Sequence, residues 1–260
     1  MPSELLFVHA TRGLDSPPLS QTHRVLGNEA DASTAFVSNV LNPALAVLQH
    51  FLAEHLRQYF EIVLLSEVVA EDVEAEPGSA SRSSLRLDHV FALVGKQKNA
   101  KGERLLRPQK ALVIIEMKRY NLVRPGDWPQ DLKAAPRPLN KDTDGRAYRL
   151  LPQLLMYAHK WRCPRIYLSD YVRCLALDID FAKLGTKVPV PVAFKFCADA
   201  SSRCDSVYEA SVRAAITFDA VEALRGLGVA NRKILGGQHP QLDADLAAHL
   251  AAFGRQHAHT

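Results

Sequence analysis

The sequence predicts an α/β fold whose elements follow one another in the order α-β-β-β-α-β, with additions at the C-terminal end. Apolar residues recur at helical spacing over residues 29–58, which predicts the first helix. Three strand-like segments follow it, and a second segment with helical spacing, residues 146–161, separates them from the next strand. Strands that are consecutive in sequence usually pair, so we expect the first three to form a meander.

Length and composition indicate a single large domain. The chain has 260 residues, of which 47% are apolar and 23% charged, as is typical of a soluble globular protein. A net charge of +4 is compatible with a polyanionic partner but does not by itself indicate one. No stretch approaches the ~18 apolar residues of a membrane span and no secretory signal is evident, so we expect an intracellular protein without membrane contact. The cysteines form no CxxC pair, and we expect reduced thiols at Cys163, Cys174, Cys197 and Cys204.

The elements of the first half are bounded by breaker residues. Residues 1–28, which include Pro17 and Pro18, predict an irregular arm before a domain that spans residues 29–260. Pro43 should break or kink the first helix after Leu41. An acidic, Gly- and Ser-rich turn is expected between the first two strands. The predicted strands cover residues 61–70, 84–95 and 111–119.

The second half begins with residues 120–145, which are rich in Pro, Gly and Asp and predict a long loop. Loops of this length are usually functional or mobile. Pro152 fits the helix over residues 146–161 only within its first turn, so the regular helix is expected to begin there. The other predicted elements are strands at 165–168, 172–179 and 191–198 and helices at 217–226 and 241–253.

Opposite charges stand at the end of an apolar run in the segment ALVIIEMKRYN, residues 111–121. Alternate residues of a strand share a face, so Glu116 and Lys118 point the same way. Asp88 lies on the preceding strand, and if the two strands are neighbours its carboxylate converges with that of Glu116. The alternative is that Glu116 and Lys118 form an ordinary surface pair at the end of a strand.

Two converging carboxylates repel one another unless a cation lies between them. Hard oxygen ligands suit Mg²⁺ or Mn²⁺. Lys118 could hold or polarise a water molecule and stabilise the charge that develops at phosphorus. These groups together suit phosphodiester hydrolysis. The next helix adds Gln153 and Tyr157, which share one face at a spacing of four residues, although an ordinary amphipathic helix would also place them so.

Taken together, these residues resemble the motifs of the PD-(D/E)XK nuclease superfamily, in particular its RecB-like branch with a QxxxY helix. The resemblance covers roughly residues 29–179 and implies a restriction-endonuclease-like αβββαβ core, with a mixed central sheet flanked by helices and an extra strand and helices after residue 180. It implies that Asp88, Glu116 and the main-chain carbonyl of Met117 bind the metal. The resemblance also implies that Lys118 assists the attacking water. It implies that Gln153 and Tyr157 position nucleic acid or catalytic groups.

Many members of this superfamily also carry a glutamate on the first helix. Glu29 is our choice for it and Glu54 is the alternative; either is otherwise an ordinary acidic residue of a helix. Two features depart from the family pattern. The position before Asp88 is Leu87 rather than proline, and the resemblance assigns no role to residues 120–145.

Weaker signals remain open between a functional and an ordinary role. Several basic residues near the motif either contact phosphates or are ordinary solvated side chains. They are Arg86, His89, Arg119, Arg124, Lys133 and Arg137. Tyr120 and Trp128 either stack on bases or pack beneath the loop. His257 and His259 have a metal-like spacing, but a frayed tail is the better interpretation.

We therefore expect a divalent-metal-dependent nuclease that uses Mg²⁺ or Mn²⁺ and acts on nucleic acid, with DNA preferred over RNA. The alternative is a nuclease-like domain without activity that binds nucleic acid or a protein partner. A third interpretation, an unrelated α/β enzyme, is favoured if Asp88 and Glu116 lie far apart. The oligomeric state is not predicted, although a homodimer is compatible with the sequence.

Overall fold

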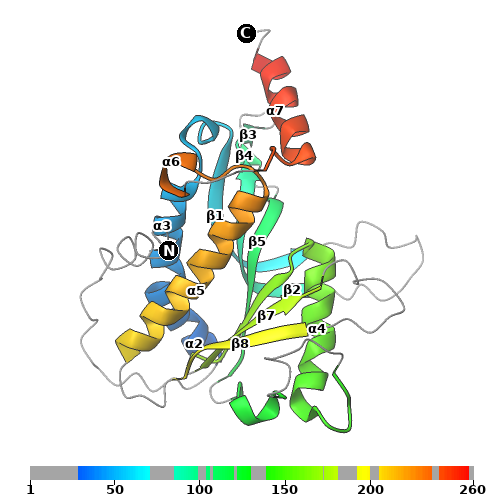
Figure 1. Cartoon of the computed structure of the whole chain (residues 1–260). Helices are drawn as coiled ribbons and strands as arrows, with labels where there is room; N and C mark the ends of the chain where they lie inside the picture. Colours follow the sequence, from blue (N-terminus) through cyan, green and yellow to red (C-terminus); the bar gives the residue numbers. More distant parts are fainter. Residues whose placement is uncertain are drawn as a thin grey trace.

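A central sheet with helices on both faces dominates the computed structural model of this chain (Figure 1). The predicted arm over residues 1–28 and the predicted turn between the first two strands lie outside the described residues. The structure describes residues 29–70, 85–98, 104–105, 108–119, 122–129, 139–171, 173–180, 192–199, 205–235 and 240–257.

The sheet has six strands in the order β1-β2-β5-β6-β7-β8. Neighbouring strands run antiparallel except β5 and β6, which are parallel, so the sheet is mixed and mostly antiparallel. Helix α4 makes the crossover that a parallel connection requires. The strands are β1 (Phe60–Ala70), β2 (Leu85–Gly95), β5 (Pro108–Met117), β6 (Arg165–Ser169), β7 (Arg173–Ile179) and β8 (Val192–Asp199), and the short pair β3 (Gln97–Lys98) and β4 (Arg104–Leu105) forms a separate ribbon.

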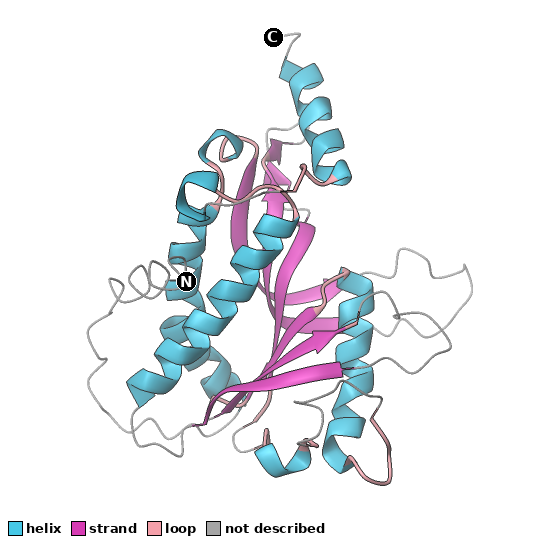
Figure 2. Ribbon diagram, viewed as in Figure 1, coloured by secondary structure: helices cyan, strands magenta, loops and turns pink. Residues whose placement is uncertain are grey.

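The α-β-β-β-α-β order and the meander of the first three sheet strands are confirmed. Two hydrophobic layers explain why the elements assemble this way. Figure 2 shows the helices on the two sides of the sheet. The larger one joins one face of the sheet to the helices of both chain ends, and the smaller one joins the other face to α4. The helices are α2 (Glu29–Phe36), α3 (Asn42–Phe51), α4 (Gly145–Trp161), α5 (Asp205–Gly226), α6 (Arg232–Leu235) and α7 (Ala244–His257).

The chain stays helical through Pro43, but its regular α-helical pattern is interrupted up to Leu41, where a break or kink was expected. Residues Val37–Leu41 form a π-helical turn that joins α2 to α3, with the amide of Asn42 bonded to the carbonyl of Val37. Pro43 has no N–H, and the widened turn placed just before it lets the chain remain helical where an α-helical bond is missing.

The first helix ends at Phe51 instead of residue 58, because a distant segment takes over the backbone groups that follow it. The amide of Ala53 donates to the carbonyl of Val229 at 2.9 Å, and the amide of Asn231 donates to the carbonyl of Phe51 at 2.6 Å. This short bridge fixes an extended backbone at Leu52, so the helix cannot continue.

The expected start of α4 at Pro152 is wrong, because the helix begins at Gly145 and Pro152 lies inside it. Pro152 is exposed, so the carbonyl of Tyr148 that lacks its helical donor lies on the side of the helix that faces water. Ala147 and Leu151 are buried before the proline, as Leu154 and Ala158 are after it, so sheet packing holds the helix on both sides.

The first C-terminal helix is longer than expected, because α5 begins at Asp205 rather than at residue 217. Its buried positions, Val212, Ile216, Ala220 and Leu224, recur every four residues along the whole interface with α3 and the sheet. Within the described residues, no helix is long and apolar enough to cross a bilayer.

Gly228 follows α5 with φ at +73°, and a Cβ there would lie 2.6 Å from the carbonyl oxygen of Gln241. We expect Gly228→Ala to lower the free energy of unfolding by more than about 1 kcal/mol, because it combines a left-handed backbone with a clash against main chain. Urea denaturation measures the change. Gly226→Ala is the matched control: a Cβ at Gly226 meets nothing within 4 Å, so equal losses in the two variants would contradict this account.

Candidate active site

Asp88 and Glu116 lie opposite one another where the β2–β5 ladder ends. The last pairs of the ladder are Val90 with Ile114 and His89 with Ile115, and Asp88 and Glu116 are the next residue of each strand. The expectation that the two residues lie on neighbouring strands is confirmed. Asp88 is also close enough for its charge to act on the carboxyl group of Glu116.

The backbone of Met117 faces Asp88. The amide of Met117 donates to Oδ2 of Asp88 at 2.7 Å, whereas the next amide, that of Lys118, donates to the carbonyl of Ser169 on β6 at 2.7 Å. The N–H and C=O of one strand residue point to the same side, so the carbonyl of Met117 is directed towards Asp88 as well. The side chain of Met117 is buried in the larger hydrophobic layer.

Glu116 is 3% exposed and its two carboxylate oxygens differ. Oε1 accepts hydrogen bonds from Nζ of Lys118 at 2.5 Å and from Nε2 of Gln153 at 2.9 Å. Oε2 is buried and, within the described residues, has no hydrogen-bond partner. A buried carboxylate oxygen without a donor is costly, so a proton, a water molecule or a cation is expected beside this atom.

Helix α4 contributes Gln153 and Tyr157 to the site. Gln153 lies between Glu116 and Tyr157, and its Nε2 approaches the hydroxyl oxygen of Tyr157 at 2.6 Å. The Tyr157 hydroxyl donates to the carbonyl of Arg86 on β2 at 2.8 Å. The pair predicted from its four-residue spacing thus links α4 to both strands that carry the carboxylates.

Burial and the negative charge of Asp88 raise the pKa of Glu116 to about 7, and Lys118 opposes this rise. Without a cation, the neutral form of Glu116 is therefore populated at neutral pH. Burial also raises the pKa of Tyr157 to about 12, so its hydroxyl stays protonated and remains a donor to Arg86.

Tyr157→Phe should lower the free energy of unfolding by roughly 1 kcal/mol, because the carbonyl of Arg86 loses its donor in a part-buried position. The ring should still pack and Gln153 should keep its bond to Glu116, so the rest of the site should be unchanged. Chemical denaturation measures the change in stability. Tyr148→Phe, on the exposed face of the same helix, is the control and should leave the stability unchanged.

The donor set fits a hard divalent cation. It consists of the carboxylate of Asp88, the unpartnered Oε2 of Glu116 and the nearby carbonyl of Met117, all oxygen atoms. Among the described residues, however, no three His, Cys, Asp or Glu side chains are grouped so that they could hold a metal ion. Glu29, the exposed first residue of α2, therefore does not join the two carboxylates, and Glu54 is exposed in the short turn Glu54–Leu56 on the far side of α3.

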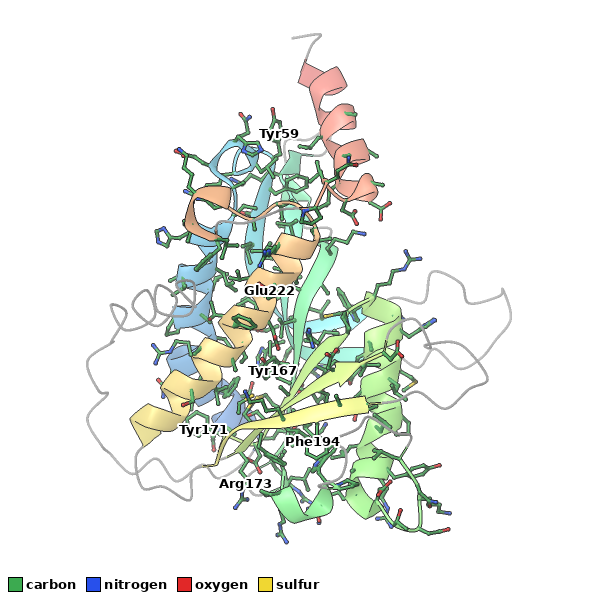
Figure 3. All side chains as sticks on the ribbon, in the orientation of Figure 1. Tyr59, Tyr167, Tyr171, Arg173, Phe194 and Glu222 are labelled. Atoms are coloured by element: carbon green, nitrogen blue, oxygen red, sulfur yellow. The ribbon has the colours of Figure 1, made fainter. Side chains whose placement is uncertain are left out.

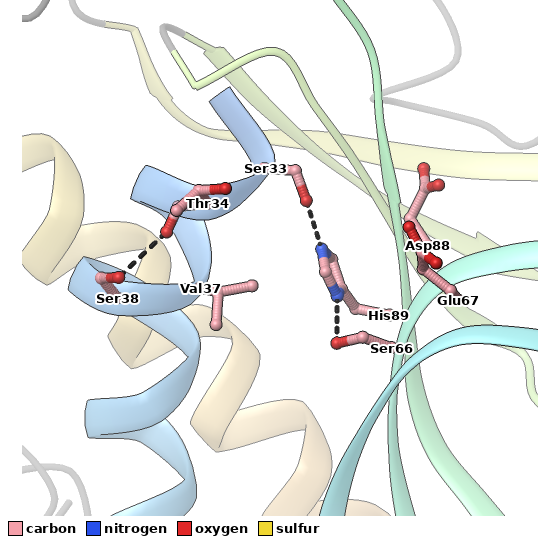
Figure 4. Close-up of a pocket in the computed structure, with 8 residues that line it drawn as sticks. All are labelled: Ser33, Thr34, Val37, Ser38, Ser66, Glu67, Asp88 and His89. Atoms are coloured by element: carbon pink, nitrogen blue, oxygen red, sulfur yellow. Dashed lines mark hydrogen bonds between the residues drawn. The ribbon is translucent and has the colours of Figure 1, made fainter. Parts of the chain in front are cut away.

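A cavity of about 290 Å³ adjoins Asp88 on the side of α2 (Figure 4). Its lining includes hydroxyl groups from both α2 and β1. His89 crosses it, with its ring nitrogens 2.8 Å from Ser33 Oγ and 2.9 Å from Ser66 Oγ. The lining residues are Ser33, Thr34, Val37, Ser38, Ser66, Glu67, Asp88 and His89.

His89 is 4% exposed, and its ring bridges α2 to β1, so both ring nitrogens have partners within the protein. Burial lowers the pKa of its imidazole. Sequence reasoning missed this bridge because no pattern links Ser33 or Ser66 to it. Glu67 was missed as well: it has φ at +54°, an uncommon value for a residue with a side chain, and its carboxylate pairs with Arg86 at 2.5 Å.

Asp170 is a second group that sequence reasoning missed. It is fully buried, and its carboxylate accepts the amide of Val123 and the amide of Arg173, both at 2.8 Å. This carboxylate thereby ties the start of the long loop to the turn after β6. The only available signal was the Ser-Asp pair at a strand end, which is common in turns.

The remaining weaker candidates separate into three groups. Trp128 is 2% exposed and its ring lies 5.5 Å from that of Phe194 on β8, so the packing alternative is confirmed. Arg119 and Arg124 are exposed at the mouth of the loop. Five predicted contacts fall outside the described residues or side chains: Tyr120, Lys133, Arg137, His257 and His259.

Comparison with protein-family models, with curated proteins and with solved structures finds no match to this chain. The geometry described above is therefore the basis for any functional conclusion.

Proposed function

We propose that the protein is a divalent-metal-dependent nuclease of the PD-(D/E)XK type, with DNA preferred over RNA. The observation that carries the proposal is the buried Oε2 of Glu116, which has no donor among the described residues. It lies beside Asp88 where the interior strands β2 and β5 meet, and Lys118 directly follows β5. An apolar core does not require such an arrangement, and a cation-dependent hydrolase does.

Asp88, Glu116 and the carbonyl of Met117 would hold the ion, which the donor chemistry identifies as Mg²⁺ or Mn²⁺. When bound, the ion would supply charge neutralisation at the scissile phosphate and an acidified water. The protein's own contribution is to hold the ligands: Asp88 is fixed by the amide of Met117, and Glu116 is fixed by Lys118 and Gln153.

Lys118 is placed to act on the attacking water and on the charge that develops at phosphorus. Its side chain is 15% exposed and one of its N–H groups bonds to Glu116, which leaves further ammonium donors for a water or a phosphate oxygen. These interactions strengthen as negative charge accumulates in the transition state, which is the condition for an effect on turnover.

Hydroxyls of Ser33, Thr34, Ser38 and Ser66 line the cavity beside Asp88, and hydroxyls are common partners of the nucleic-acid backbone. The same lining includes the carboxylates of Glu67 and Asp88, so a phosphate group would approach Asp88 only with a cation between them.

The test is incubation of the purified chain with end-labelled single- and double-stranded DNA and RNA of one sequence, with Mg²⁺, Mn²⁺ or EDTA. We expect cleavage with either metal and none with EDTA. Asp88→Asn is the matched control, because the amide oxygen of asparagine still accepts from Met117 while the charge is lost.

Two results would contradict the proposal. Cleavage that persists in EDTA excludes a metal-dependent centre, and cleavage by Asp88→Asn at the wild-type rate places the activity elsewhere. Nucleic-acid binding without cleavage under every condition would support the alternative, a domain of this fold that binds without catalysis.

A further inference from the structure

Cys174 and Cys197 lie side by side on neighbouring strands, away from the candidate active site. Strands β7 and β8 pair with Cys174 opposite Ala198 and Leu175 opposite Phe196, so Cys197 is the extra residue of a β-bulge. A bulge redirects the side chain of its extra residue. Here both cysteines belong to the same hydrophobic layer, Cys174 as a buried member and Cys197 packed against it.

The two thiols are neighbours in this layer, and both are free among the described cysteines. Cys174 is fully buried, whereas Cys197 is half-buried and also lies 3.9 Å from the carbonyl of Lys195. Cys197 is next in sequence to Ala198, the residue paired with Cys174, so the two thiols can approach one another without a change in the path of the chain.

Cys197 opens onto a cavity of about 660 Å³ between the sheet and α5. Tyr167 and Glu222, on opposite sides of this cavity, are labelled in Figure 3. Lys195 and Arg225 bring positive charge to the cavity wall. A small molecule can therefore reach Cys197, but it cannot reach Cys174 behind it.

The electrostatics give the two cysteines different roles. The hydrogen bond from Cys174 lowers the pKa of Cys197, and Lys195 acts in the same direction. Burial raises the pKa of Cys174. The accessible sulfur is thus the better nucleophile, and its buried neighbour is a latent second thiol.

We propose that Cys174 and Cys197 form a reactive dithiol that low-molecular-weight disulfides, such as glutathione disulfide, oxidise to an intramolecular disulfide. The thiolate of Cys197 attacks one sulfur of the small disulfide, forms a mixed disulfide and releases one small thiolate. Cys174 then gives up its proton, attacks the sulfur of Cys197 and releases the second small thiol. The small disulfide is reduced to two thiols, and the protein loses two hydrogens.

Cys163 provides an internal comparison. It is fully buried in the smaller hydrophobic layer under α4, and burial raises the pKa of its thiol to about 12. Its sulfur bonds to the carbonyl of Arg165 rather than to another thiol. Cys163 should therefore remain reduced under conditions that oxidise the dithiol.

Peptide mapping can follow each cysteine separately, because trypsin places the four on different peptides. The folded full chain is treated with glutathione disulfide, then denatured and alkylated without a reductant, and digested. We expect a disulfide-linked pair of peptides that contain residues 174–183 and 196–203, and a fully alkylated Cys163. The cross-link should also raise the melting temperature by a few degrees, because it constrains the unfolded chain.

Variants separate the two steps. Cys174→Ala should stop the reaction at the mixed disulfide, with one glutathione retained on Cys197. Cys197→Ser should leave Cys174 unmodified. Glutathione that stays on Cys197 in the wild-type chain, a link from Cys197 to Cys204, or no modification of Cys197 would each overturn the proposal. None of these readouts depends on nuclease activity, so the outcome is independent of the proposed function.

Discussion

Lys118→Ala should lower the turnover number of metal-dependent cleavage by roughly 10²- to 10³-fold, while the affinity for nucleic acid stays within a few-fold of wild type. Nζ of Lys118 lies 2.5 Å from Oε1 of Glu116 and is part-exposed, so it can reach a water or phosphate beside the carboxylates. An interaction made mainly in the transition state affects turnover rather than binding. Single-turnover cleavage and a binding titration in Ca²⁺ measure the two quantities separately.

Lys110→Ala is the matched control for Lys118→Ala. Lys110 lies on the same strand and is also ion-paired, but its partners are Asp243 and Asp245 beside α7, at the other end of β5. The control variant should retain turnover. Lys118→Arg should still lose most of the activity, because the planar guanidinium keeps the charge but not the shape of the ammonium. Wild-type cleavage by Lys118→Ala would show that the centre is wrongly assigned.

Glu116→Gln should make the metal-free protein more stable at pH 8 by at most about 3 kcal/mol, with no difference near pH 4.5. The pKa of Glu116 is raised from 4.5 to about 7 in the folded chain. Between these values the folded state holds a proton that the unfolded state has released, so the free energy of unfolding of the wild type falls as pH rises through this window. Glutamine stays neutral, so the variant lacks this loss.

A divalent cation should restore the stability that the wild type loses as the pH rises. Metal bound to the ionised carboxylates stabilises the folded state by mass action, by about 2.7 kcal/mol at a hundredfold excess over the dissociation constant. Glu116→Gln should lose this response, and lower pH should weaken it in the wild type because protons compete for the same oxygen atoms. Thermal unfolding at pH 5, 6.5 and 8, with and without Mg²⁺ or Mn²⁺, measures both effects.

Asp219→Asn is the control for the metal response. Asp219 is another carboxylate whose pKa is raised by burial, but it accepts from Tyr167 near α5, away from β2. This variant should keep the full stabilisation by metal. A wild-type stability that does not change between pH 4.5 and 8, or a metal response that survives in Glu116→Gln, would exclude the assigned carboxylate pair.

The local pattern of β5 was sufficient to place the candidate site on one face of the sheet. Ile114 packs in the smaller hydrophobic layer, whereas Ile115 and Met117 pack in the larger one, as the period of two requires. The spacing of Gln153 and Tyr157 was equally informative, because helical geometry alone sets them on the face that meets Glu116.

Local signals failed where a distant segment decides the outcome. Phe51 ends its helix because the backbone of residues 229–231 bonds to the residues that follow it, a contact no local propensity can report. Pro152 was expected to start α4, but sheet packing on both sides of it outweighs one lost hydrogen bond.

By itself, the sequence determined the order of the elements and which residues share each face of β5. It also identified Asp88, Glu116 and Lys118 as candidate site residues. These conclusions follow from residue periods of two in strands and 3.6 in helices. Only the tertiary structure decided that Oε2 of Glu116 is left without a donor, that His89 is a bridge and that Cys174 and Cys197 are neighbours on paired strands. The reason is that strand register, bulges and burial are set by packing between segments far apart in the chain, and they determine which polar groups meet.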